Sequence, residues 1–532
     1  MIRTIIVKNY RCFQDFKLYL NPHLNIVVGD NDAGKSTLLE AVNLALTFRL
    51  NGRKVASNEL SPYAINGEAV KSYLARLAQD SHTPPPEILI EVYFTDAPEM
   101  ANLRGTNNSL QEDVPGVRFR AMLSSEFVDE YRASIANPQE LRLVATEYYD
   151  IEWLAFSGSP VSTRDLPSAA SLIDASTIRL QSGADYYLQS IIETHLEKAE
   201  RVELSRSYRS LREGFSQNES VQLVNTKLAG EQGDISDRTL SLAIDISHRF
   251  TWESSLVPHL DDLPFHCIGK GEQNTLKILL ALNRRGVNSH VVLVEEPENH
   301  LSFSTLNALV AKIADKCKDR QVLITTHSSY VLNKLGLHNL VLLSGDRVLR
   351  IGDLPADTED YFKKLSGYDT LRLVLAKKVI LVEGPSDELV VQRAYLDIHG
   401  HLPIEDGIDV LSVRGLSFKR FLDLAVGLGR KTAVVTDNDG KDPAAVAARY
   451  SAYEGNPCIS IHVGEDSEWR TLEPQLLRAN SLAEMNAVLG ASHVDDASLL
   501  KYMEDNKSTC ALKVFESAQQ LNMPKYILDA IA

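Results

Sequence analysis

Alternating strand-like and helix-like hydrophobic patterns divide the chain into α/β units. At the start, TIIVKNY and LNIVVG are short β-branched runs typical of strands, and KSTLLEAVNLALTF has apolar residues at helical spacing. Further strands are predicted at EILIEVYF, VRFRAML, LRLVATEYY and IEWLAF. Residues 1–164 are therefore expected to form the first part of an α/β domain.

A different pattern occupies residues 165–245. The segment YYLQSIIETHLEKAERVELSRSYRSLREGF predicts one long charged helix, in which Glu197 and Arg201 lie one helical turn apart. We interpret residues 165–245 as an inserted helical arm. The alternative is that this helix covers one face of the sheet.

Strand and helix patterns then alternate again to the end of the chain. HVVLVEE and QVLITTH predict buried strands within residues 246–375, which would complete the first domain. Residues 376–532 predict a second α/β domain, with strands at KVILVEG, IDVLSVRG and TAVVTDNDG and a helix-rich tail. The expected fold class is α/β.

The composition is that of an ordinary soluble protein, with 44% hydrophobic and 24% charged residues among 532. No apolar run is long enough for a transmembrane helix, and MIRTIIVKNYRCF does not have the pattern of a signal or transit peptide. The five cysteines are scattered without a CxxC pair, which argues against a zinc site or a disulfide framework. A reducing, cytoplasmic location is expected.

The net charge of −16, taken alone, argues against a nucleic-acid partner, because phosphate contacts require Lys and Arg. A local basic groove can nevertheless coexist with an acidic total, and clustered metal-ligand carboxylates raise the acidic count. The charge therefore does not exclude DNA.

The segment GDNDAGKST, Gly29 to Thr37, fits the pattern GxxxxGK[ST] between a strand and a helix. Glycine lets the backbone wrap closely around a phosphate with its N–H groups turned inward. The lysine would reach the β- and γ-phosphates of ATP, and the serine would ligate Mg²⁺. The residues predicted to bind the nucleotide here are Asn31, Gly34, Lys35, Ser36 and Thr37.

Two later segments supply residues for the same site. HVVLVEEPENHL places Glu295 in reach of the magnesium shell and Glu296 where it could polarise the attacking water. VLITTHSS is a strand that would deliver His327 to a γ-phosphate. A surface Glu-Glu pair and a structural histidine are the alternatives, and the order of the motifs favours function.

A second cluster of acids follows the strands of the C-terminal domain. VILVEGPSD ends a strand at Glu383 with Asp387 one helical turn later, and VVTDNDG ends another with Asp437 and Asp439. Side chains at i and i+2 of a strand point the same way, and open α/β sheets bind ligands at the carboxyl ends of their strands. Four converging carboxylates would repel unless a divalent cation compensates them, and oxygen ligands suit Mg²⁺ or Mn²⁺. The alternative is that DNDG only makes a turn.

The P-loop, the Glu-Glu strand and the segment IGKGEQ together resemble the ABC-type P-loop ATPase head of SMC-like proteins. In that family the signature segment of one head meets the P-loop of another, so ATP is sandwiched in a dimer. The family usually reads LSGGEQ, whereas this chain has glycine in place of the serine and lysine in place of a glycine. The departure puts fast hydrolysis in doubt more than ATP-driven pairing. The signature residues implied are Gly269, Lys270, Gly271 and Gln273.

The pattern VEGxxD followed by DxDG resembles the Toprim fold, a Rossmann-like parallel sheet. An SMC-like head followed directly by Toprim resembles the OLD (overcoming lysogenisation defect) family of nucleases, over nearly the whole chain. The resemblance implies that residues 165–245 are a dimerisation insert. It also implies two metal ions in the Toprim site, an additional acid at Glu473 and a lysine near the scissile phosphate at Lys507. Glu383, Asp437 and Asp439 would hold one ion, with Asp387 and Glu473 at the second.

The sequence therefore predicts an ATP-binding, divalent-metal-dependent DNA endonuclease or nickase that acts as a homodimer or higher oligomer. One Mg²⁺ would accompany ATP, and the resemblance implies antiviral defence, with a partner defence protein left open. The main alternative is an ATP-dependent DNA-binding switch or scaffold whose Toprim domain docks a partner effector. A plain ATPase sensor that signals through a partner is a third reading.

Overall fold

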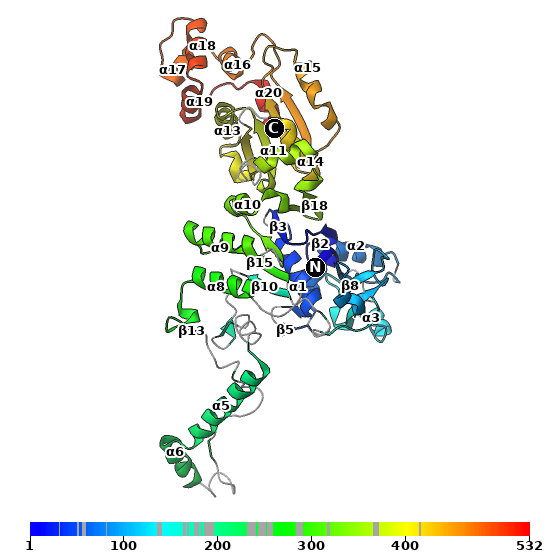
Figure 1. The fold of residues 1–532 in the computed structure, drawn as a ribbon. Helices are drawn as coiled ribbons and strands as arrows, with labels where there is room; N and C mark the ends of the chain where they lie inside the picture. The colour runs from blue at the N-terminus through cyan, green and yellow to red at the C-terminus, as the bar shows by residue number, and fades with distance from the viewer. Residues whose placement is uncertain are drawn as a thin grey trace.

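The structure is a computed structural model of the 532-residue chain. Figure 1 shows α5 and α6 at one end of the molecule and α17, α18 and α19 at the other. None of the helices in the described ranges combines the length and apolarity needed to cross a bilayer. The described residues are 1–30, 32–50, 53–55, 60–80, 82–135, 141–162, 166, 170–174, 180–181, 184–185, 196–230, 241–242, 252, 259–283, 291–316, 320–364, 372–413 and 417–532.

The centre of the N-terminal domain is a six-stranded sheet in the order β10-β15-β16-β3-β17-β18. All neighbouring pairs are parallel except β17 with β18. The strands are nearly continuous apolar runs because helices or a second sheet cover both faces. Their bounds are β3 (Leu24–Gly29), β10 (Ala170–Asp174), β15 (Val291–Glu295), β16 (Gln321–Thr325), β17 (Leu340–Ser344) and β18 (Arg347–Arg350).

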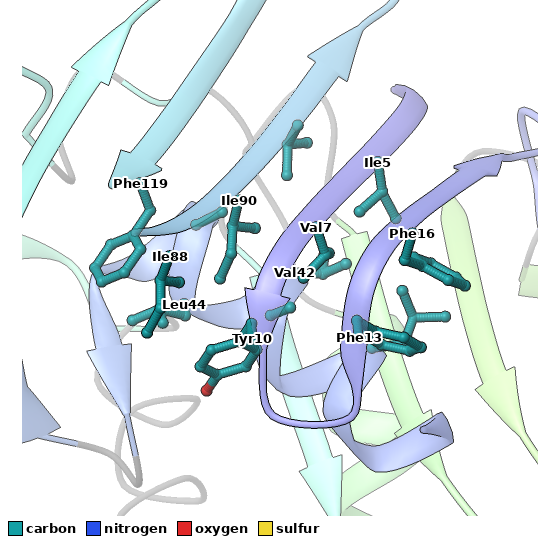
Figure 2. Packing of buried hydrophobic residues seen from close by; sticks show 14 of the residues in the cluster. Ile5, Val7, Tyr10, Phe13, Phe16, Val42, Leu44, Ile88, Ile90 and Phe119 are labelled. Carbon is teal, nitrogen blue, oxygen red and sulfur yellow. The ribbon is translucent and has the colours of Figure 1, made fainter. Parts of the chain in front are cut away.

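A second, antiparallel sheet in the order β2-β1-β6-β8-β7, with β9 paired to β8, packs against helix α1. Figure 2 shows the core between them, where side chains of the β1–β2 hairpin meet Val42 and Leu44 of α1. The predicted strand LRLVATEYY is wrong except at its last residue, Tyr149, where β9 begins. Residues 141–148 form no strand, and Thr146 Oγ1 donates to Leu60 O at 2.7 Å. The bounds are β1 (Ile2–Tyr10), β2 (Phe13–Tyr19), β6 (Ile88–Phe94), β7 (Arg104–Gly105), β8 (Val114–Leu123), β9 (Tyr149–Ala155) and α1 (Lys35–Thr47).

The helical arm begins later than residue 165. Residues 170–174 form β10, which pairs in parallel with β15 and belongs to the central sheet. Helix α5 (Lys198–Ser216) and helix α6 (Glu219–Gly230) make up the described part of the arm, and they project away from the sheets in Figure 1. Residues 186–195 of the predicted long helix lie outside the described residues.

The remaining helices of this domain cover its two sheets and their connections. Short two-residue strand pairs lie in the loops. The bounds are α2 (Gly67–Leu77), α3 (Val128–Ser134), α8 (Lys270–Asn283), α9 (Phe303–Lys316), α10 (Ser329–Leu335), α11 (Ala356–Lys364), β4 (Arg49–Leu50), β5 (Arg53–Lys54), β11 (Leu180–Gln181), β12 (Ala184–Asp185), β13 (His259–Leu260) and β14 (Leu263–Pro264).

The C-terminal domain is built on a parallel four-stranded sheet in the order β20-β19-β21-β22. Since β19 and β21 are direct neighbours, the segments that follow them meet at one edge of the sheet. The bounds are β19 (Lys378–Val382), β20 (Ile408–Ser412), β21 (Lys431–Thr436), β22 (Ile459–Val463), α13 (Pro385–His399), α14 (Phe418–Leu428), α15 (Pro443–Ala447), α16 (Leu472–Ala479), α17 (Leu482–Leu489), α18 (Asp496–Asp505), α19 (Lys507–Glu516) and α20 (Lys525–Ile531).

The two domains share a hydrophobic core. One cluster of buried residues includes Leu342 of β17 together with Phe421 and Leu424 of α14. Helix α14 packs on β18, and Gly427 approaches Leu349 so closely that a Cβ there would lie 2.8 Å from the leucine side chain. Apolar packing therefore continues across the predicted boundary at residues 375 and 376.

Candidate functional site

The P-loop connects β3 to α1. Gly34 occupies the left-handed region with φ 95°, and the chain enters α1 at Lys35. The buried Lys35 side chain folds back across the loop, where Nζ donates to Gly29 O at 3.0 Å and to Asp30 O at 2.9 Å. Burial lowers the pKa of this lysine, and the Glu296 carboxylate opposes that change. The predicted Asn31 lies outside the described residues.

The acidic strand end and the histidine approach the P-loop from neighbouring strands. Ser36 Oγ donates to the carboxylate of Glu295, the last residue of β15. Glu296 has φ 44° and lies 3.5 Å from His327 Nε2 through its Oε1. Burial and the nearby Lys35 ammonium lower the pKa of His327, so the imidazole is neutral near pH 7. Ser36, Glu296 and His327 line a pocket of ≈ 1080 Å³ together with Gly34, Lys35 and Thr37.

The signature segment lies apart from this pocket. Lys270 begins α8 and is exposed, and Gly269 has open space around it. Gly271 is needed for a close approach, since a Cβ there would lie 2.3 Å from His300 O. Gln273 is buried and donates to Ile268 O at 2.8 Å, and this contact holds the loop before α8 in shape. None of these four residues is among those that line the pocket of the described P-loop.

Glu298 is a residue of this region to which the sequence reading assigned no role. Its Oε1 accepts hydrogen bonds from Thr326 Oγ1 at 2.7 Å and from the His327 backbone N–H at 2.8 Å. Burial raises the pKa of this carboxyl. Glu298 of the PENHL segment therefore positions the turn that carries His327. The signal available in the sequence was this third glutamate, two residues after the Glu-Glu pair.

Substituting Gly34 tests the backbone conformation of the P-loop. Alanine at this position would place its Cβ 2.6 Å from the Phe13 ring and 2.7 Å from Cys12 Sγ, at a φ that L residues rarely adopt. We expect Gly34→Ala to lower the free energy of unfolding by about 2 kcal/mol or more. Urea unfolding measures this change.

The matched control is Gly67→Ala at the start of α2, where a Cβ meets nothing within 4 Å. Its stability should be unchanged or higher by about 0.4–1 kcal/mol. Equal stability of the two variants would contradict the described loop conformation.

The second group of predicted residues gathers at the carboxyl ends of β19 and β21. Glu383 follows β19, and its Oε1 accepts from Thr436 Oγ1 at 2.5 Å and from the Asp437 backbone N–H at 3.1 Å. Asp387 lies in the first turn of α13, where it accepts from the Gly384 N–H at 2.9 Å. The two contacts of Glu383 hold the ends of β19 and β21 together, and the Asp387 contact caps the start of α13.

Asp437 is held at both carboxylate oxygens. Oδ2 accepts from the Leu472 N–H at 3.1 Å, and Oδ1 accepts from the Tyr526 hydroxyl at 3.1 Å. The next residue of α16, Glu473, is buried and accepts from Lys507 Nζ at 3.0 Å. The additional acid and the lysine implied by the family resemblance are therefore ion-paired with each other beside Asp437.

Mutual repulsion and burial perturb the pKa values of these acids. Burial, followed by the Asp387 and Glu383 charges, raises the pKa of Asp437 to about 8. Burial raises the pKa of Asp387 to about 6, with Glu383 and Glu473 adding to the shift. Burial alone would lower the pKa of Lys507, but its hydrogen bond and attraction to Glu473 raise it overall. The site therefore holds more negative charge than its own lysine offsets.

Asp439 differs from the expectation for a strand residue. Strand β21 ends at Thr436, so Asp437 and Asp439 lie in the following turn and the i, i+2 rule does not apply to them. Asp439 is exposed with φ 51°, and its N–H donates to Arg470 O at 3.1 Å. The buried Asn438 between the two aspartates anchors the turn through Nδ2, which donates to Asp466 O at 2.6 Å.

The donor set fits a divalent cation in its chemistry. Four carboxylates gather here, and a hard dication would offset the burial and the mutual repulsion that raise the pKa values of Asp437 and Asp387. Within the described part of the chain, no three His, Cys, Asp or Glu side chains are already spaced as ligands of one ion. Binding would therefore require side-chain rearrangement within the cluster.

Comparison with known proteins defines the class. Residues 24–333 match the family described as "AAA domain, putative AbiEii toxin, Type IV TA system", and residues 374–439 match "Overcoming lysogenization defect protein-like, TOPRIM domain". The fold is thus α/β, with an AAA-type ATPase domain followed by a TOPRIM domain. The first match covers more than half of the chain, so the chain belongs to that AAA-domain family. An OLD-like TOPRIM domain follows on its C-terminal side.

Individual curated proteins and solved structures are also similar to parts of the chain. The chain is 22% identical over 499 residues to "Endonuclease GajA" of Bacillus cereus, which covers 88% of this chain and 80% of the relative. It is 48% identical over 46 residues to the "OLD nuclease" of Thermus scotoductus, covering 9% and 8%. Among solved structures, an SMC head bound to the C-winged helix domain of ScpA covers 66% of this chain and 99% of that one, with 13% identity and a TM-score of 0.34. The C-terminal region of the Xanthomonas campestris OLD protein covers 29% and 93%, with 22% identity and a TM-score of 0.24.

Proposed function

We propose that this protein is an ATP-binding, divalent-metal-dependent DNA endonuclease or nickase of the OLD type. The observation that carries the proposal is the meeting of Glu383, Asp387, Asp437 and Glu473 with Lys507 at the carboxyl ends of parallel TOPRIM strands. The similarity to an endonuclease over 88% of the chain supports it.

The acidic cluster would hold two ions, Mg²⁺ or Mn²⁺. Its candidate ligands are Glu383, Asp387, Asp437 and Glu473, and Asp439 would join from the exposed turn beside them. When bound, such ions supply an activated water and charge that stabilises the leaving oxygen. Lys507 would exchange its contact with Glu473 for the scissile phosphate, where its positive charge offsets the negative charge that develops.

The P-loop would bind ATP. Lys35, Thr37 and the backbone N–H groups at the start of α1 would contact the phosphates, and Ser36 with Glu295 would hold one Mg²⁺. Glu296 would orient the attacking water, and His327 would contact the γ-phosphate. Because the signature segment lies outside the described pocket, we propose that its exposed residues Gly269 and Lys270 reach the P-loop of a second copy in a homodimer. Gly271 and Gln273 would hold the segment in shape.

The biological setting is part of the proposal and rests on the likeness to OLD-type proteins. We propose that the protein acts on DNA in the cytoplasm as a defence against phage. In this setting the ATPase head would gate cutting by the TOPRIM domain, and a partner defence protein would be a candidate trigger.

Plasmid cleavage tests the proposed function. We expect nicking or linearisation with Mg²⁺ or Mn²⁺, and none after EDTA is added. Because the pKa values of Asp437 and Asp387 are about 8 and about 6, protons compete with the metal below those values. The half-saturating Mg²⁺ concentration should therefore rise as the pH falls from 9 to 6, by up to about tenfold per pH unit for each proton displaced.

Two outcomes would count against this proposal. Cutting that persists in EDTA would remove the metal requirement. ATP-dependent DNA binding without cutting under any metal would instead support the alternative, a DNA-binding switch or scaffold.

A further inference from the structure

A buried tyrosine from the last helix reaches the acidic cluster. Tyr526 lies on α20, which packs against β21, β22 and α13 beside the TOPRIM sheet (Figure 1). Its side chain is 4% exposed and belongs to the same hydrophobic cluster as its neighbour Ile527. From this position the hydroxyl donates to Asp437 Oδ1 at 3.1 Å, across 89 residues of sequence.

The two hydrogen bonds to Asp437 fix the plane of its carboxylate. Oδ1 is held by the Tyr526 hydroxyl and Oδ2 by the Leu472 N–H, both at 3.1 Å. Each carboxylate oxygen has two lone pairs, so each keeps one for a metal ion. With the Tyr526 hydroxyl removed, the Leu472 N–H would be the one contact of this carboxylate left among the described residues, and the carboxylate could turn about it.

We propose that Tyr526 is a positioning residue of the nuclease site, which holds the Asp437 carboxylate in the orientation that binds a divalent ion. This inference rests on the proposed metal-dependent nuclease function. Hydrogen-bonding partners of metal ligands contribute to affinity because they orient the ligand before the metal arrives. The C-terminal helix would thus be part of the catalytic scaffold, although it contains none of the predicted ligands.

A neutral hydroxyl is suited to this role. Tyrosine donates to Asp437 through a hydroxyl that carries no charge, and its usual pKa of about 10 keeps it protonated near neutral pH. A lysine at this position would place a positive charge beside the ion, whereas tyrosine orients the carboxylate without that repulsion. The aromatic ring meanwhile packs in the core and limits the motion of the hydroxyl.

The test is Mn²⁺ binding to the full chain without nucleotide, measured by the electron paramagnetic resonance signal of free Mn²⁺. Tyr526→Phe keeps the ring and removes only the hydroxyl. We expect it to weaken the Asp437-dependent Mn²⁺ binding by roughly tenfold to a hundredfold. Excess Mn²⁺ should restore much of the DNA cleavage rate, because the variant lowers metal affinity and leaves the ligands in place.

The matched control is Tyr395→Phe, because Tyr395 is another buried TOPRIM tyrosine whose hydroxyl donates to a carboxylate, Asp406, at 2.5 Å. It should bind Mn²⁺ as the wild type does. Thermal unfolding without metal shows whether both variants are equally well folded, and the rise in Tm on adding Mn²⁺ gives a second measure of affinity.

The outcomes separate the inference from the proposed function. Wild-type Mn²⁺ affinity in Tyr526→Phe would overturn the positioning role even if cleavage fell. Equal weakening in Tyr395→Phe would also overturn it, since the effect would then be one of general stability. If Asp437→Ala left Mn²⁺ binding unchanged, the proposed metal site itself would fail.

Discussion

Replacing Asp437 by alanine is expected to abolish DNA cleavage, with a loss of at least about 100-fold. The reason is its central position: it contacts the Glu383 carboxylate through its backbone N–H, and its own carboxylate lies between Leu472 and Tyr526. Removing the Asp437 carboxylate takes away a proposed ligand from the metal site that lies between the ends of β19 and β21. Conversion of supercoiled plasmid to nicked or linear DNA in Mg²⁺ or Mn²⁺ measures the loss.

The control for this variant is Asp496→Ala. Asp496 is an exposed aspartate in the first turn of α18 of the same domain, and its replacement should leave cleavage unchanged. Equal nicking by wild type and Asp437→Ala would show that the activity comes from a contaminant, and the nuclease assignment would fail.

The second large effect is expected at the P-loop, where Lys35→Ala should abolish ATP binding. The Lys35 ammonium is buried and already held by two backbone carbonyls, so it is positioned to meet phosphate with little further loss of side-chain freedom. Hydrogen bonds to charged groups contribute about 1.5–3 kcal/mol each. Losing two such bonds between the ammonium and the ATP phosphates would therefore raise the Kd for ATP by about 100-fold or more. Calorimetric titration with ATP measures it.

Lys312→Ala, an exposed lysine on α9, is the control and should bind ATP normally. Basal metal-dependent cutting is expected to survive in Lys35→Ala because the proposed nuclease site is formed by different residues. Unchanged nucleotide affinity in this variant would count against the P-loop assignment.

Both sites were predictable where their residues follow a strand in an unbroken segment. LNIVVGDNDAGKST, HVVLVEE and KVILVEG each contain an apolar strand and the residues that follow it, so local sequence fixes both the element and the position of its side chains. Parallel neighbouring strands then bring such ends together. The ATPase and TOPRIM architecture followed from these segments and agrees with the family matches.

The prediction was less accurate where pairing or chain direction depends on distant residues. Residues 170–174 belong to the central sheet because β15 offers a parallel partner more than 100 residues later, and the local sequence resembles the arm around it. Asp439 does not continue the strand because the Asn438 side chain donates hydrogen bonds to Asp466 O and Trp469 O. The sequence DNDG does not specify these contacts.

The sequence alone determined which residue types end the strands, and hence the chemistry that each strand end can support. Tertiary structure alone decided how those residues are held. Tyr526 and Leu472 donate hydrogen bonds to Asp437, and Lys507 donates one to Glu473. Glu298 accepts one from the backbone N–H of His327. The physical reason is that a strand and the turn after it form from contacts within a few residues. A buried hydrogen bond between segments 34 or 89 residues apart exists only after the core has brought them together.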